Sequence, residues 1–165
     1  MQRRSFASGS VLAVLLSGCG FKLRSPQNFV FQTVAVTPAT GSAVATELAR
    51  YLGDAVRPLV PPPGGQAPQA IVDVLEEQRE KTVVGVNASG QVREFQLRIR
   101  VLFRVRTPQG RELIANAEIT QQRDISFSES AVLSKEAEEA LLYRDMQNDI
   151  VQQLLRRLAA IKSLE

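Results

Sequence analysis

The segment Pro108-Gln109-Gly110 lies between two runs in which apolar and polar residues alternate. Proline suits the first position of a type I turn, and glycine suits the left-handed residue that closes a three-residue hairpin loop. Such a loop sets Thr107 opposite Arg111 and predicts an antiparallel hairpin. In this register every facing pair on one side is apolar: Val105 with Leu113, Phe103 with Ala115, Val101 with Ala117 and Ile99 with Ile119. A slip of one residue would destroy this match.

The rest of the chain predicts two more strands and two helices. Ser42 is a good helix N-cap, and apolar residues recur after it at helical spacing. The expected elements are a strand over 29–37, a helix over 43–57, a proline-rich loop over 59–68, strands over 70–86, 92–107 and 111–127, and a helix over 134–162. The charged run 76–81 is also compatible with a helix. The order β-α-β-β-β-α predicts an α+β fold, in which two helices pack on one face of a four-stranded sheet.

One predicted strand carries a row of arginines that point in the same direction. Arg98, Arg100, Arg104 and Arg106 alternate with apolar residues, so they share the face away from the core. Guanidinium groups bind phosphate and carboxylate groups bidentately. The hairpin register also offers cross-strand ion pairs, Arg106 with Glu112 and Arg100 with Glu118. Arg98 would then face Thr120 and Arg104 would face Ile114. The row is thus either a solvated, partly paired face or an anion-binding surface, and Arg98 and Arg104 are the better candidates for a ligand.

The first residues have the parts of a secretory signal. Arg3 and Arg4 precede an apolar stretch that is shorter than the roughly 20 residues of a membrane-spanning helix. The stretch ends in Leu16-Ser17-Gly18-Cys19, which resembles the lipobox of bacterial lipoproteins. This resemblance implies a signal peptide over 1–18, a diacylglycerol on Cys19 and one mature domain over 19–165. Gly20, in place of Asp, favours the outer membrane. The start also resembles part of a twin-arginine signal, but we expect the general secretory route.

Composition excludes several classes of site. The chain has no His and no Trp, and its single Cys is assigned to lipid. A Ser-His-Asp triad, a Cys-His pair and a His- or Cys-based metal site are therefore excluded. We expect no enzyme activity, no cofactor and no metal. Without Arg3 and Arg4 the chain has 18 basic residues against 17 acidic ones, so its charge does not point to nucleic acid.

Two segments resemble the LptE family of lipopolysaccharide-assembly lipoproteins. They are Leu16-Ser17-Gly18-Cys19-Gly20-Phe21-Lys22-Leu23-Arg24 and the stretch from Leu142 to Ile150, followed by Gln153-Leu154-Leu155-Arg156-Arg157-Leu158. The resemblance implies an outer-membrane, periplasm-facing protein that plugs and helps to assemble the LptD β-barrel and binds lipopolysaccharide. Lipid A phosphates would then be ligands for the arginine row.

Two other functions share these sequence features. One is an adaptor lipoprotein of another barrel-assembly complex, which a different copurifying barrel would reveal. The other is a stand-alone periplasmic lipid-binding module, which requires a sizeable apolar pocket.

Overall fold

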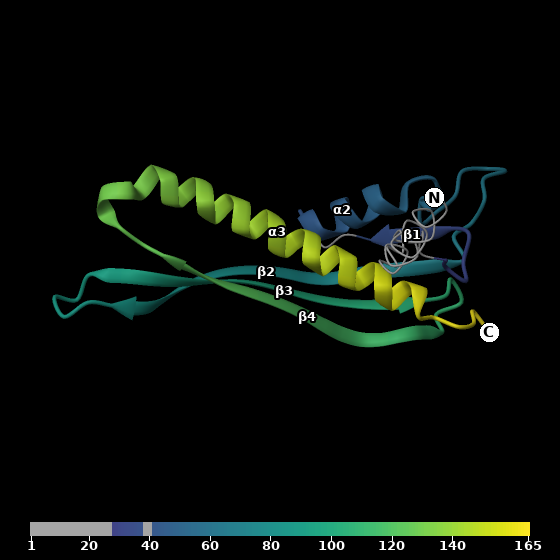
Figure 1. Cartoon of the computed structure of the whole chain (residues 1–165). Helices are drawn as coiled ribbons and strands as arrows, with labels where there is room; N and C mark the ends of the chain where they lie inside the picture. The colour runs from purple at the N-terminus through teal and green to yellow at the C-terminus, as the bar shows by residue number, and fades with distance from the viewer. Residues whose placement is uncertain (1–27, 38–40) are drawn as a thin grey trace, which may run out of the picture.

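The computed structural model describes residues 28–37 and 41–165, which form a four-stranded sheet with two helices on one face (Figure 1). The elements are β1 (Val34–Thr37), α2 (Ala43–Leu52), a 3-10 turn (Gly53–Ala55), β2 (Ala70–Val86), β3 (Val92–Arg106), β4 (Glu112–Ser126), a second 3-10 turn (Glu129–Ala131) and α3 (Val132–Ala159). This order confirms the predicted β-α-β-β-β-α fold. The predicted signal peptide and Cys19 lie outside the described residues.

The sheet has the order β1-β2-β3-β4, with β1 parallel to β2 and the other pairs antiparallel. A parallel pair needs a crossover, and α2 provides it between β1 and β2. The long helix α3 follows the length of the sheet, while α2 lies only at the end that contains β1 (Figure 1). Among the described residues, no helix has the length and apolarity needed to cross a membrane.

Strand β1 is shorter than the sequence predicts. The expected strand over 29–37 forms ladder pairs only from Val34 onward, with Ala70 as its first partner. Before this point Phe31 is buried and stacks on Phe29, with ring centroids 5.1 Å apart. Apolar packing rather than strand pairing therefore accounts for the apolar residues that precede β1.

Strand β2 has the bounds that the sequence predicts, and its charged run is extended. Within the run, Glu77, Arg79 and Lys81 bond to groups of the helix layer, whereas Glu76 and Glu80 lie near arginines of β3. This alternation has the period of a strand, so each charged side chain finds a polar partner on its own face.

The hairpin between β3 and β4 forms as predicted. The Thr107 amide donates to the Arg111 carbonyl at 2.8 Å, and Gly110 has φ +93°. Beyond Arg106 and Glu112, however, the predicted register is wrong. Val105 lies opposite Ile114, Phe103 opposite Ala117, Val101 opposite Ile119 and Ile99 opposite Gln121.

Two register shifts near the hairpin explain the difference. Each places one extra residue on β4, as a β-bulge does. Because side chains alternate with a period of two, two such shifts together return the residues beyond them, from Ala117 onward, to their predicted face. Between the shifts the predicted faces are wrong: Ile114 packs on the core side and Ala115 is exposed. The buried face of β3 is therefore as expected: Leu97, Ile99, Val101, Phe103 and Val105 are 0% exposed.

The core lies between this face of the sheet and both helices. From α3 the buried residues include Met146, Ile150, Leu154 and Leu158, and from α2 they include Val44 and Leu48. The predicted helix over 43–57 ends earlier, at Leu52, because Gly53 adopts a positive φ of 51° and its amide closes the helix on the Ala49 carbonyl. The predicted helix over 134–162 corresponds to α3 with small shifts at both ends.

Candidate interaction surface

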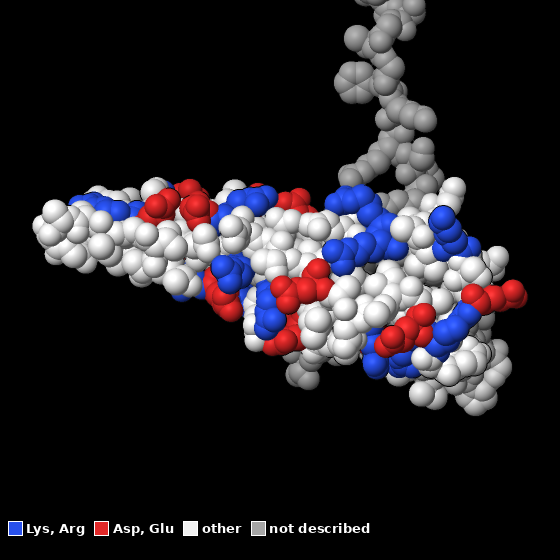
Figure 2. Space-filling model, turned by 90° about the horizontal axis from the view of Figure 1, so that it is seen from below, with Lys and Arg blue, Asp and Glu red and all other residues white. Residues whose placement is uncertain are grey.

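The face of the sheet opposite the helices carries the arginine row of β3. Figure 2 looks onto this side of the molecule and shows basic and acidic side chains interspersed along it. The side chains of Arg98, Arg100, Arg104 and Arg106 are between 24% and 42% exposed. The predicted common direction of the four arginines is therefore consistent with the structure.

Asp73 on β2 binds two of the arginines. Its Oδ2 atom accepts from Nε of Arg104 at 2.8 Å and from Nε of Arg106 at 2.7 Å. Its Oδ1 atom accepts from the hydroxyl of Thr37 at 2.7 Å. The cluster thus joins β1, β2 and β3 through one carboxylate that is 9% exposed.

These bonds determine the protonation of Asp73. Burial alone would raise the pKa of this carboxyl, but hydrogen bonds from Arg106, Thr37 and Arg104 outweigh burial and lower the pKa to about 2. The hydrogen bond between Arg106 and Asp73 also raises the pKa of Arg106. Asp73 therefore remains a carboxylate throughout the neutral range, although two guanidinium groups share its charge.

The other two arginines have weaker, more exposed ion pairs. Arg100 lies 3.2 Å from Glu118 on β4 and 3.5 Å from Glu76 on β2. Arg98 lies 3.7 Å from Glu80, and both side chains are more than 40% exposed. Pairs of this kind contribute about 1 kcal/mol or less, because solvent screens them.

The structure corrects some of the ion-pair partners that the sequence predicts for the arginine row. Arg106 faces Glu112 as predicted, but its ion pair is with Asp73. Arg100 faces Thr120 rather than Glu118 and reaches Glu118 diagonally.

The expectation that Arg98 and Arg104 lack an opposed acid is wrong. On β4 Arg98 faces Gln122 rather than Thr120, and Ile114 faces Val105 rather than Arg104. On the other side, β2 places Glu80 opposite Arg98 and Asp73 opposite Arg104. The hairpin between β3 and β4 could not reveal these partners, because they lie on the other neighbouring strand. Of the four, Arg98 has the longest ion-pair distance, and it remains the most available to an anionic ligand.

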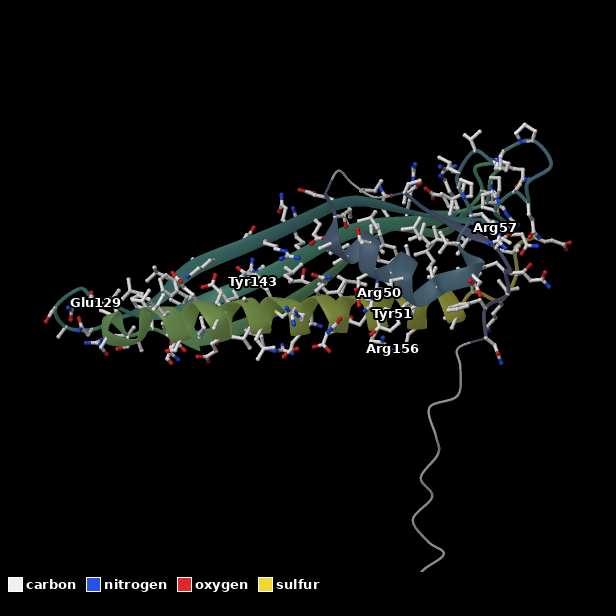
Figure 3. The ribbon with its side chains drawn as sticks, turned by 90° about the horizontal axis from the view of Figure 1, so that it is seen from above. Arg50, Tyr51, Arg57, Glu129, Tyr143 and Arg156 are labelled. Carbon is white, nitrogen blue, oxygen red and sulfur yellow. The ribbon has the colours of Figure 1, made fainter. Side chains whose placement is uncertain are left out.

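A groove of about 740 Å³ lies on the helix side, next to β2. Its lining comes from α2, β2 and α3, and is made up mostly of charged and amide side chains: Glu47, Arg50, Arg79, Lys81, Glu136, Glu139, Ala140, Tyr143, Arg144, Gln147 and Asn148. Figure 3 shows Arg50 on α2 and Tyr143 on the part of α3 that extends past the N-terminal end of α2. Such a lining suits a polar partner better than an acyl chain.

Two ion pairs and a hydrogen bond cross or border this groove. Lys81 on β2 binds Glu139 on α3 at 2.6 Å, and Arg50 binds Glu47 within α2. Arg79 donates to Gln147 at 3.0 Å and lies over the ring of Tyr143. Sequence analysis missed this groove. The signal in the sequence was the charged run 76–81, which places Arg79 and Lys81 on one face of an extended strand.

The fold defines a class of bacterial lipoproteins. A lipoprotein B from Nitrosomonas europaea has 36% identity and a TM-score of 0.70, over 86% of this chain and 91% of that chain. Two other structures share the fold at lower identity. A minor lipoprotein from Acinetobacter baumannii has 23% identity and a TM-score of 0.61, over 81% and 94% of the two chains. Rare lipoprotein B from Shewanella oneidensis has 20% identity and a TM-score of 0.59, over 78% and 92%.

The family follows from a match over most of the chain. The model of the LptE family, described as lipopolysaccharide-assembly, matches residues 31–158, so the chain belongs to this family. Among curated proteins, none matches the chain. The family resemblance predicted from the sequence is confirmed.

Proposed function

We propose that this protein is an outer-membrane lipoprotein that occupies the lumen of the LptD β-barrel, assists its assembly and binds lipopolysaccharide during its final transfer to the cell surface. Residues 1–18 are its signal peptide, residues 19–165 are its mature domain, and acylated Cys19 is its anchor. Several acyl chains on one cysteine make such attachment effectively stable.

The observation that carries this proposal, beyond family membership, is the charged open face of the sheet. Each of the four arginines of the row, Arg98, Arg100, Arg104 and Arg106, lies within 4 Å of a carboxylate, so the face is strongly polar without a large excess of one charge. The interior of a large outer-membrane barrel is polar as well. A plug with this face can contact such a wall through hydrogen bonds along three long strands.

Lipopolysaccharide binding is assigned to the same face, with Arg98 as its most available cation. The Arg98 guanidinium can turn from Glu80 to a lipid A phosphate, because its present ion pair is long and exposed. Arg104 and Arg106 are held by Asp73 and have less freedom to turn.

The test replaces Arg98 by glutamate and measures binding of purified lipopolysaccharide to the full lipoprotein. We expect the R98E variant to bind about tenfold more weakly, since a charge-assisted contact becomes repulsive. The matched control is R123E. Arg123 on β4 faces the helices, is 43% exposed and pairs with Asp149 at 3.1 Å. Equal binding by R98E and the unmodified protein would remove Arg98 from the site, and an equal loss in R123E would show a general effect of charge.

A further inference from the structure

Strand β2 is much longer than the strand beside it. It has 17 residues, but the four residues of β1 pair only with Ala70–Asp73. Within residues 28–37 and 41–165, no strand lies next to β2 on this side from Val74 to Val86. An edge of this kind presents backbone N–H and C=O groups to any extended segment that approaches it.

The register identifies which backbone groups point outward. Along a strand, successive residues point their side chains to opposite faces and their N–H and C=O groups to opposite sides. Residues whose side chains share a face therefore also point their backbone groups to the same side. Ala70, whose side chain faces the helices, donates its amide to Thr33 at the β1 side. Glu77, Arg79 and Lys81 also face the helices, so their amides and carbonyls point to the open side, whereas those of Gln78 and Glu80 point to β3.

The groove described above lies along the same edge. Arg79 and Lys81 line it from β2, and residues of α2 and α3 form its other walls. A segment added beside β2 would direct every second side chain into this groove. Apolar side chains at both ends of the edge, Leu75, Val83, Val84 and Val86, are between 39% and 59% exposed and would be partly covered by it.

Charge determines which segment fits. On the helix side the incoming side chains would lie beside Arg79 and Lys81, because the carboxylate of Glu77 is 8% exposed and bonded to the start of α2. Arg144 of the same groove has no ion pair in the described part of the chain. On the open face they would lie beside Glu76 and Glu80. Cross-strand neighbours of opposite charge are favourable. The edge therefore fits a segment with acidic residues facing the helices and basic residues facing outward.

We propose that residues 76–83 of β2 bind an extended segment of the barrel partner by strand addition, with acidic side chains of that segment in the groove. This inference rests on the proposed function and names a second surface that contacts the barrel, beside the open face of the sheet. The regular stretch between the two bulged regions of β2 spans eight residues, or about 26 Å of extended chain. Strand addition derives its affinity from main-chain hydrogen bonds and its specificity from alternate side chains.

The experiment measures hydrogen–deuterium exchange at individual amides of the full lipoprotein, alone and in its purified complex with LptD. We expect the Arg79 and Lys81 amides to exchange at least about tenfold more slowly in the complex, because each gains a hydrogen bond. The Gln78 and Glu80 amides, already bonded to β3, serve as internal controls and should change little. Strand β4, at the other edge of the sheet, should keep its exchange rates.

A charge reversal tests the groove separately. We expect R79E to lose most of the added protection at Lys81, whereas R123E, which changes an ion-paired arginine of similar exposure on β4, should keep it. If the complex forms and Arg79 and Lys81 exchange as fast as in the free protein, strand addition is wrong while the plug function stands. If the free protein shows the same protection together with the mass of a dimer, the edge binds a second copy instead. If no complex with LptD forms, both proposals fail.

Discussion

Glu77 on β2 caps the helix that begins at Ser42. Its Oε2 atom accepts from the Ser42 hydroxyl at 2.7 Å and from the Val44 amide at 2.9 Å, while Ser42 itself accepts from the Ala45 amide. Two helix amides without intrahelical partners are thus bonded, and a carboxylate lies at the positive end of the helix. The first turn of α2 is therefore tied to the sheet across 35 positions of sequence.

This link predicts a coupled loss of stability. We expect S42A and E77A each to lower the free energy of unfolding by about 1–2 kcal/mol, because each leaves a helix amide without a partner. The double variant should lose less than the sum of the two, since both residues serve the same turn. Urea unfolding of the unmodified protein, the two single variants and the double variant measures this coupling energy. Strictly additive losses would show that the two contacts act independently.

The Asp73 cluster predicts an acid-sensitive contribution to stability. The folded pKa of about 2 lies below the ordinary value of 3.8, so the contribution is complete above pH 4 and is lost as pH falls toward 2. The shift corresponds to about 1–2 kcal/mol once the exposure of the two arginines is taken into account.

Replacing Asp73 by asparagine should remove this dependence. We expect D73N to be about 2–3 kcal/mol less stable at pH 7, because Arg104 and Arg106 then lie together without a carboxylate. Its stability should fall less steeply than that of the unmodified protein between pH 4 and pH 2. The control E80Q, which affects the long pair with Arg98, should change stability by under about 0.5 kcal/mol. Parallel pH profiles of D73N and the unmodified protein would contradict the assigned role of Asp73.

Phe103 should be among the most sensitive core positions. It is fully buried near the C-terminal end of β3, and the guanidinium of Arg157 on α3 lies 5.5 Å from its ring centroid. We expect F103A to cost about 3–5 kcal/mol through the cavity that it leaves. F127A removes a half-buried ring near the far end of the sheet and should cost under about 2 kcal/mol. Thermal unfolding compares the two variants, and equal losses would show that the core is not centred on β3.

The Pro108-Gln109-Gly110 turn requires its glycine. Gly110 has φ +93°, a region that costs other residues about 1–2 kcal/mol. A Cβ at this position would meet no atom within 4 Å, so G110A tests backbone strain without a clash. We expect G110A to be about 1 kcal/mol less stable and Q109A to be neutral. An unchanged midpoint of unfolding for G110A would argue against the observed turn conformation.

Local patterns predicted most of the fold. The bounds of β2, the turn at Gly110 and the buried face of β3 follow from alternation and turn chemistry, which depend on nearby residues. The exact register between β3 and β4 could not be predicted from the sequence. Two bulges shift it by two residues in total, which leaves the alternation beyond them unchanged. The end of α2 depended on the conformation of one glycine.

The sequence predicted the face on which the four arginines lie but not the carboxylates that bind them. The common face of the arginines follows from their spacing, whereas their carboxylate partners depend on β2 pairing with β3. Asp73 and Glu80 lie 31 and 18 positions before Arg104 and Arg98, and no local pattern connects them. The open edge of β2 depends on where β1 pairs along it. Thr37, the predicted and observed end of β1, lies opposite Asp73, and no local pattern reveals this parallel register.

The most direct test of the proposed function is the purification of the full lipoprotein, with its native lipid anchor, under mild detergent. We predict that a large outer-membrane barrel of the LptD type copurifies with it in equal amount, and that mass spectrometry finds acyl chains on Cys19. Recovery of the acylated protein alone, or with a different barrel, would contradict the plug function and favour a stand-alone lipid-binding module or an adaptor of another assembly complex.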